Sequence, residues 1–211
     1  MSKRKVRTPR NLRLRAETRQ TLAILRNRSL KGDVDAMWQL GLRELDWKST
    51  SHTAKSAIAL KRLREAARGN LDYQFQLGTM LVEGYGGLPK QIPKGIELLR
   101  KAARKGNSDA QYQLGVYFGT GTGGLERDRA ASVKWYEKAA AQGNSTAMYN
   151  LAVAYSSSKS VMNLELARKW LVKGAQLGNE ECLEWLSECL RTGQLGFKVG
   201  EDLSKFISDS A

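Results

Sequence analysis

The stretch Gly106-Asn-Ser-Asp-Ala-Gln-Tyr-Gln-Leu-Gly115 decides the fold of this chain, because its pattern recurs along the sequence. A Gly-Asn or Gly-Asp step opens each copy, at Gly32-Asp33, Gly69-Asn70, Gly106-Asn107, Gly143-Asn144 and Gly178-Asn179. The steps are 37, 37, 37 and 35 residues apart. A fixed period of this length is typical of stacked helical units rather than of a globule around one central site. We therefore expect function to lie on an extended surface.

Each copy predicts two antiparallel helices, which we call helix A and helix B. In the third copy, helix A carries a small residue, Ala110, followed four positions later by Leu114. This spacing places both residues on one helix face, so the leucine should be buried and the small residue should let a neighbouring helix approach. The leucine recurs as Leu40, Leu77, Leu114, Leu151 and Leu186.

Helix B ends in a pair of small residues just ahead of the next Gly-Asn step. The pairs are Ala66-Ala67, Ala102-Ala103, Ala139-Ala140 and Gly174-Ala175. The glycine suits the position that follows a helix, where a positive φ ends it. The Asn or Asp after it supports the turn into the next helix. In the first copy the stretch between the alanine pair and Gly69 is one residue shorter.

The repeats also predict how the chain is divided. We expect residues 1–15 to be a mobile basic arm and residues 16–207 to be an α-α superhelical solenoid of about four and a half helix pairs, an all-α fold. A capping helix is expected at 16–31, repeats near 32–68, 69–105, 106–142 and 143–177, and a partial repeat at 178–207. Leu203, Phe206 and Ile207 would close the C-terminal end as a short amphipathic helix.

Composition narrows the class of protein. The 211 residues carry a net charge of +14, and residues 1–31 alone hold eleven Lys or Arg against one Glu. No apolar run approaches the roughly 18 residues that a membrane span needs, and the basic N-terminus lacks the apolar stretch of a secretory signal. We therefore expect a cytoplasmic protein. Cys182 and Cys189 are too far apart along one predicted helix to pair, which predicts reduced thiols.

Catalytic chemistry is hard to assemble from this sequence. The segment Gly119-Thr-Gly-Thr-Gly-Gly124 matches the glycine pattern of dinucleotide-binding loops, but the same place in the second copy reads Gly84-Tyr-Gly-Gly87. Both are therefore interpreted as loops between helices, and the acidic residue of a nucleotide site is missing. His52 is the one histidine, so neither a zinc site nor a nucleophile-histidine pair can be built away from it. We predict no catalytic residue, no metal and no cofactor.

The pattern resembles the Sel-one-like repeat (SLR) family, whose members are related to tetratricopeptide repeats. The third copy carries the resemblance best, through Ala110 to Gly121, Asp128, and Trp135 to Asn144. The resemblance covers about residues 32–196. It implies scaffolding or regulatory roles, commonly in bacterial signalling, secretion and host interaction, and some members are accessory or immunity proteins. The first and fourth copies lack the family's glycine loop, having 46–52 and 156–160 instead, and irregular loops in repeat arrays often carry specificity.

In tetratricopeptide-like stacks helix A lines a concave groove, and the resemblance therefore implies a binding groove here. An aromatic column recurs as Trp38, Phe75, Tyr112 and Tyr149. An amide column lies beside it as Gln39, Gln76, Gln113 and Asn150. Amides both donate and accept, so a ladder of them can pair with the backbone of an extended peptide. Alternatively, the aromatics pack against helix B and the amides are ordinary solvated positions.

Two basic surfaces offer another interpretation. The N-terminal arm carries Lys3, Arg4, Lys5, Arg7, Arg10, Arg13 and Arg15. Helix B of the second copy carries Arg100, Lys101, Arg104 and Lys105. Basic clusters attract acidic partners or nucleic-acid phosphates, although the arm has no aromatic residue for base stacking. Alternatively, the arm is a solubilising tail and the helix B residues form an ordinary solvated face. We expect a non-enzymatic adaptor that binds another protein or an extended peptide, with a nucleic-acid-associated protein as the alternative.

Overall fold

A computed structural model describes residues 9–45 and 54–207 of the chain. These residues form helices joined by turns and loops, and no strand occurs among them. Helices pair along the sequence as the repeats predict, so the all-α helix-pair fold is confirmed. The chain divides into two compact units, Met1–Gln91 and Ile92–Ala211, which are described separately below.

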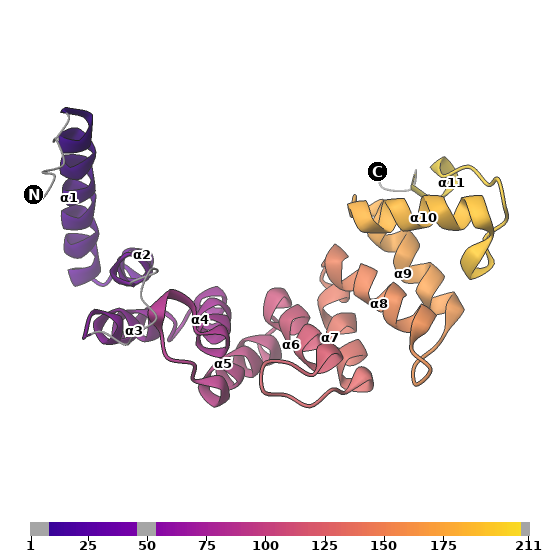
Figure 1. Cartoon of the computed structure of the whole chain (residues 1–211), viewed down its shortest axis with the longest axis horizontal. Coiled ribbons are helices and arrows are strands. Elements are labelled where there is room, and N and C mark those ends of the chain that lie inside the picture. Colours follow the sequence, from indigo (N-terminus) through magenta and orange to yellow (C-terminus); the bar gives the residue numbers. More distant parts are fainter. Residues whose placement is uncertain (1–8, 46–53, 208–211) are drawn as a thin grey trace, which may run out of the picture. The chain divides into compact units, whose positions relative to one another are not determined.

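The first unit holds the first helices of the chain (Figure 1). They are α1 (Pro9–Leu30), α2 (Val34–Glu44), α3 (Ala54–Ala66), α4 (Leu71–Glu83) and the short 3-10 helix η1 (Tyr85–Gly87). Each of α1 to α4 contacts the next. The helix that contains the expected capping segment 16–31 begins earlier than expected, at Pro9. Leu22 and Leu25 of α1 pack on Ala36 and Leu40 of α2, which covers the exposed end of the first helix pair.

The second unit contains the remaining helices. They are α5 (Ile92–Arg104), α6 (Ser108–Thr120), α7 (Arg129–Ala141), α8 (Ser145–Ser157), α9 (Leu164–Gln176), α10 (Glu180–Thr192), η2 (Gln194–Gly196) and α11 (Ser204–Ile207). Consecutive helices from α5 to α10 contact one another. As expected, Leu203, Phe206 and Ile207 pack on the last cluster of buried residues. The guanidinium group of Arg168 lies 4.2 Å from the centre of the Phe197 ring and donates to the Gly196 carbonyl.

The residue after each repeat glycine caps the next helix A. In every copy an Asn or Asp side chain accepts a hydrogen bond from a backbone N–H of the first helical turn. The bonds run from Ala36 to Asp33, Tyr73 to Asn70, Ala110 to Asn107, Ala147 to Asn144, and Cys182 to Asn179. These side chains satisfy donors that a helix start otherwise leaves without partners.

The preceding helix ends through the same two residues. The N–H of Gly106 donates to the carbonyl of Ala103, and the N–H of Asn107 donates to that of Ala102. Gly106 has a φ of 97°, a left-handed conformation that only glycine adopts without strain. The same pair of bonds forms at Gly143 and at Gly178. The small-residue pair and the Gly-Asn step are therefore one hydrogen-bonded unit.

The first copy uses a different ending, as its missing residue suggests. Gly69 does not have a positive φ. Instead, the buried side chain of Gln74 donates from Nε2 to the carbonyls of Ala67 and Arg68, at 2.8 and 3.2 Å. A side chain from the following helix thus supplies donors that the shortened turn does not.

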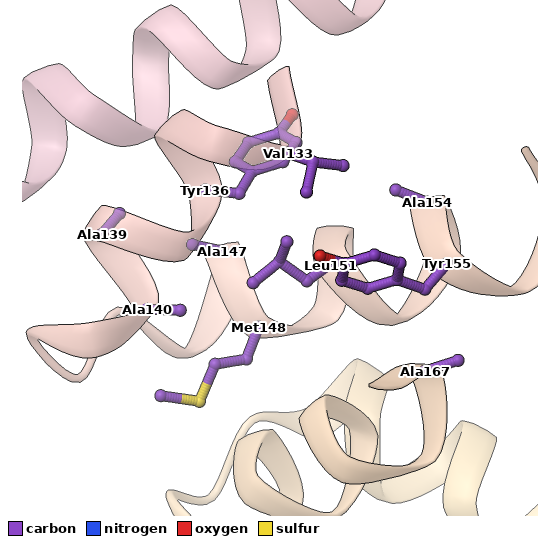
Figure 2. Packing of buried hydrophobic residues seen from close by; sticks show 10 residues of the cluster. All are labelled: Val133, Tyr136, Ala139, Ala140, Ala147, Met148, Leu151, Ala154, Tyr155 and Ala167. Atoms are coloured by element: carbon purple, nitrogen blue, oxygen red, sulfur yellow. The ribbon is translucent and has the colours of Figure 1, made fainter. Parts of the chain in front are cut away.

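The repeated leucines form the core predicted for them. Leu40, Leu77, Leu114, Leu151 and Leu186 are all 0% exposed. The small residues next to them allow helices to pack closely, since a Cβ on Gly115 would lie 2.5 Å from the Tyr136 ring. Figure 2 shows Leu151 among the apolar side chains of α7, α8 and α9. The small residue four positions before each leucine is alanine in the first, third and fourth copies and Cys182 in the fifth, whereas the second copy has the larger Tyr73.

Each described loop from helix A to helix B is closed by one backbone hydrogen bond. The bonds run from Gln91 to Leu81, Asp128 to Phe118, Asn163 to Tyr155, and Gly200 to Leu190. Three of these loops span ten residues, and the loop of the fourth repeat spans eight. The loop of the first repeat, 46–52, lies outside the described residues.

The burial of the repeated leucines predicts the effect of replacing one of them with a smaller side chain. Leu114→Ala should lower the free energy of unfolding by about 2–5 kcal/mol, through lost burial and the cavity left behind. Because each repeat is supported by its neighbours, the melting transition should also broaden. Leu177→Ala is the matched control, since Leu177 is 52% exposed. Equal melting temperatures for Leu114→Ala and the unchanged protein would contradict the alignment of repeats.

The capping role of the Gly-Asn step predicts a second effect. Asn144→Ala should cost about 1 kcal/mol of stability, because the N–H of Ala147 loses its acceptor. Asn144→Ser keeps a capping oxygen and should retain most of that stability. Thermal unfolding of the three proteins in parallel makes the comparison. An alanine variant as stable as the unchanged protein would show that the cap contributes nothing.

Candidate functional site

The aromatic column directs much of its surface into the protein. In the first unit, Trp38 is 3% exposed and stacks on Tyr73, with ring centroids 4.4 Å apart and planes 6° from parallel. The hydroxyl of Tyr73 donates to Asp35 over 2.6 Å. Burial, followed by this hydrogen bond, raises the pKa of Tyr73 to about 12. Phe75 is half-buried.

The second unit shows the same tendency. Tyr112 is half-buried, with its ring centroid 5.9 Å from that of Tyr136 on α7. Tyr149 packs edge-on against Trp185 of α10, at 6.0 Å. Each ring therefore bridges two helices and keeps only part of its surface open. Packing inside the stack, the alternative to ligand binding, accounts for nearly all of the Trp38 side chain. It accounts for part of the Tyr112 and Tyr149 side chains.

The amide column keeps its polar groups available. Gln39 and Gln76 are exposed in the first unit, and Gln113 and Asn150 are half-buried in the second. Within the described part of the chain, none of these four side chains forms a hydrogen bond. Their donors and acceptors are therefore occupied by water or open to a ligand. In each unit the two amides stand on successive A helices, α2 and α4, then α6 and α8.

A second amide position emerges only from the structure. The patterns Gln74-Phe-Gln76 and Gln111-Tyr-Gln113 each contain two glutamines. The first of each pair is buried, and the Nε2 of Gln111 donates to the Ala103 carbonyl at 2.9 Å. Gln142 in turn donates to the Oε1 of Gln111 at 2.7 Å. The inner glutamines stabilise helix ends, so only the outer ones are candidates for binding.

The basic candidates fall into two groups. Arg100, Lys101, Arg104 and Lys105 are all exposed, along and just after α5. Arg10, Arg13 and Arg15 belong to α1, but the positions of their side chains lie outside the described part. Lys3, Arg4, Lys5 and Arg7 precede the described residues altogether. The structure therefore presents a basic face on α5.

The glycine-rich segment of the third repeat has a packing role. It follows helix α6 rather than a strand, and Gly121 ends that helix with a φ of 73°. A Cβ on Gly124 would lie 2.4 Å from Ile92, so this glycine permits close contact with the start of α5. The segment is thus a loop between helices, as predicted, and not a nucleotide-binding turn.

Cysteine reactivity, metal binding and membrane spanning can be assessed for residues 9–45 and 54–207. Cys182 and Cys189 are free and buried, and burial raises the pKa of the Cys182 thiol to about 12. Across residues 9–45 and 54–207, no three His, Cys, Asp or Glu side chains are grouped to hold a metal ion. None of the helices in those ranges has an apolar stretch of the length that crossing a bilayer requires. His52 lies outside the described residues.

Comparison with known families gives a match over more than half of the chain. A family model described as the Sel1 repeat matches three consecutive stretches, residues 71–107, 108–144 and 145–179. The matched stretches follow one another without a gap, as the predicted repeats do. No curated protein sequence matches the chain.

Solved structures show the same fold. A Sel1 repeat protein from Oxalobacter formigenes is 24% identical, with a TM-score of 0.68, over 90% of this chain and 74% of that one. A protective antigen of uropathogenic Escherichia coli, which displays an SLR fold, is 30% identical with a TM-score of 0.71. The match covers 90% of this chain but 40% of the antigen. An immunity protein from Pseudomonas aeruginosa, at 18% identity and a TM-score of 0.42, is too dissimilar to support an argument.

Proposed function

The chain belongs to the Sel1 repeat family, and we propose that it is an adaptor that binds an extended segment of a partner protein through its outer amide column. Sel1 repeat proteins generally mediate protein–protein interaction and are typically scaffolds rather than enzymes. The proposal adds a specific surface to that general role. The ligand of this surface is a peptide backbone, and the chain performs no catalytic step in this proposal.

One observation carries the proposal: the outer amides form no side-chain hydrogen bond to any residue that the structure describes. Gln113 on α6 and Asn150 on α8 occupy equivalent positions of neighbouring repeats. A peptide that leaves water must replace its lost hydrogen bonds or incur a desolvation cost. Amides at a regular spacing offer such replacements to an extended segment. The open parts of Tyr112 and Tyr149 add apolar contact beside them.

The proposal also includes the cellular compartment of this adaptor. Free, buried thiols at Cys182 and Cys189 suit a reducing compartment, which favours the cytoplasm. The E. coli relative is a protective antigen, a property of that protein. An accessory or immunity-type role in a bacterium is compatible with an adaptor, and identification of the partner would test it.

The amide column generates a direct test. Gln113→Ala should weaken binding of a partner recovered by affinity purification by about 1 kcal/mol or more, since its hydrogen bonds to the peptide are lost. Gln76→Ala should act in the same direction. Both changes should leave the melting temperature nearly unchanged, because neither side chain is hydrogen-bonded to a residue in the described ranges. Titration of the purified partner measures the affinities.

Gln194→Ala provides the control, because Gln194 is an exposed amide in η2 and lies outside helix A. Affinities unaffected by both Gln113→Ala and Gln76→Ala would move the binding site to the basic face of α5 or to the loop 46–52.

The concentration of charge in residues 1–31 favours a second candidate, a nucleic-acid-associated protein. If the arm engages duplex phosphates, the logarithm of the affinity should fall linearly with the logarithm of salt concentration, with a slope of about −0.9 per neutralised phosphate. Deleting residues 1–8 should flatten that slope and leave the circular dichroism signal of the helices intact. Absence of binding to a DNA duplex at low salt would eliminate this candidate.

A further inference from the structure

The loop of the fourth repeat differs from its counterparts in a way that changes the surface around it. In the third repeat, the loop between Phe118 and Asp128 packs Gly124 against Ile92 at the start of the preceding helix B. The fourth loop, between Tyr155 and Asn163, is two residues shorter and contains no glycine. It is closed by the same type of hydrogen bond, at 2.8 Å.

An open cavity of about 470 Å³ lies between this loop and α7. Its apolar lining includes Val133 of α7, Tyr155 of α8 and Leu166 of α9. Val133 and Tyr155 belong to a buried cluster, seen around Leu151 in Figure 2, and Leu166 packs on that cluster. The base of the cavity is therefore continuous with the core and held in place by it. Met162, which is 62% exposed, extends the apolar lining at the edge.

Positively charged side chains outnumber carboxylates in the lining of the cavity. Lys134 and Lys159 line it, and both are exposed. Neither forms an ion pair within the described part of the chain. The one carboxylate in the lining, that of Glu137, accepts a hydrogen bond from the Tyr155 hydroxyl at 2.7 Å. The cavity therefore combines an apolar base with two lysines that are not in an ion pair within the described residues, against a single carboxylate.

A neighbouring depression lies next to the cavity. It shares Ala130 and Ser160 with the cavity and is also lined by Arg127 and Arg129. Of its acidic residues, Asp128 already accepts a bond from the N–H of Ala131 as the cap of α7. Glu126 also lines it, so the two arginines are balanced by two carboxylates and the depression adds no net positive charge to the site.

We propose that this cavity binds an acidic, extended segment of a partner protein, with an apolar side chain over Val133, Tyr155 and Leu166 and carboxylates beside Lys134 and Lys159. The proposal rests on the adaptor function, because it assumes a protein partner, but its site shares no residue with the amide column. Charge complementarity selects an acidic segment over a basic one. The apolar base rewards burial of an aliphatic or aromatic side chain.

A nucleic acid fits this site less well than a peptide. Bases bind to single-stranded sites largely by stacking on open aromatic rings. Tyr155 is 7% exposed, and its hydroxyl is held by Glu137. The open part of Tyr155 is therefore too small for a base to stack over the ring, although it can form the edge of an apolar contact.

The test uses a fluorescein-labelled heptapeptide, Glu-Asp-Leu-Glu-Phe-Asp-Glu, and the full-length protein. Fluorescence anisotropy should detect binding, and the double variant Lys134→Glu and Lys159→Glu should weaken it about tenfold or more, because repulsion replaces attraction at both positions. Lys169→Glu is the charge-matched control, since Lys169 is an exposed residue of α9 outside the cavity lining. It should change the affinity by less than about twofold. If the double variant fails to fold, Lys159→Glu alone, in the loop, replaces it.

Two further ligands identify what the site recognises. A peptide with serine in place of leucine and phenylalanine should bind about fivefold more weakly or worse. A thymidine oligonucleotide of equal charge should bind more weakly than the heptapeptide. Equal affinity for the serine peptide, equal or stronger binding of the oligonucleotide, equal losses in Lys169→Glu and the double variant, or no detectable heptapeptide binding would each overturn the proposal.

The two binding hypotheses can fail separately. Gln113→Ala should leave heptapeptide affinity within about twofold, since Gln113 lies outside the cavity lining. A heptapeptide that binds normally to Gln113→Ala and to Gln76→Ala, while both retain the purified partner, would remove the amide column and leave the cavity in place.

Discussion

Two adjacent residues, a glycine and an asparagine, connect consecutive helix pairs of this protein. At Gly106-Asn107 both backbone N–H groups point back to the carbonyls of the alanine pair, while the asparagine side chain caps the helix ahead. The same two residues therefore supply the hydrogen bonds that end one helix and the hydrogen bond that begins the next. The turn therefore has little freedom, and each helix A starts at a defined angle to the preceding helix B. Where the turn recurs unchanged, at Gly143 and Gly178, it sets the same positions of successive repeats in register, and the repeated leucines are buried.

The structure also shows how one helix can carry two kinds of amide. In Gln111-Tyr-Gln113 the inner glutamine bonds to the preceding helix and the outer one faces away from such partners. Residues two apart on a helix point in widely different directions, so the same residue type serves stability at one position and remains open at the other. The distinction matters for mutagenesis, because replacing Gln111 would disturb the fold, whereas replacing Gln113 tests the proposed binding role without that disturbance.

Among the described residues, the repeats vary both in the turn at Gly69 and in the loops that join helix A to helix B. The loop of the fourth repeat loses two residues and all its glycines, yet its closing hydrogen bond is retained. The helices on either side consequently stay in place, and the change appears as a cavity rather than as a shift in packing. A repeat protein can in this way gain a local binding site without altering the stack.

The sequence by itself determined the helix pairs, the capping residues and the buried leucines, because each depends on residues within one repeat or on its spacing. Period, capping chemistry and the alternation of small and large side chains are local properties that can be read along the chain. Only the tertiary structure decided that Trp38 stacks on Tyr73 of the following repeat, that Gln74 reaches back to Ala67, and that Lys134 and Lys159 flank one cavity. These features depend on which side chains meet across separate helices. Contacts of this kind depend on how the helices pack in three dimensions, which a repeat pattern constrains but does not specify.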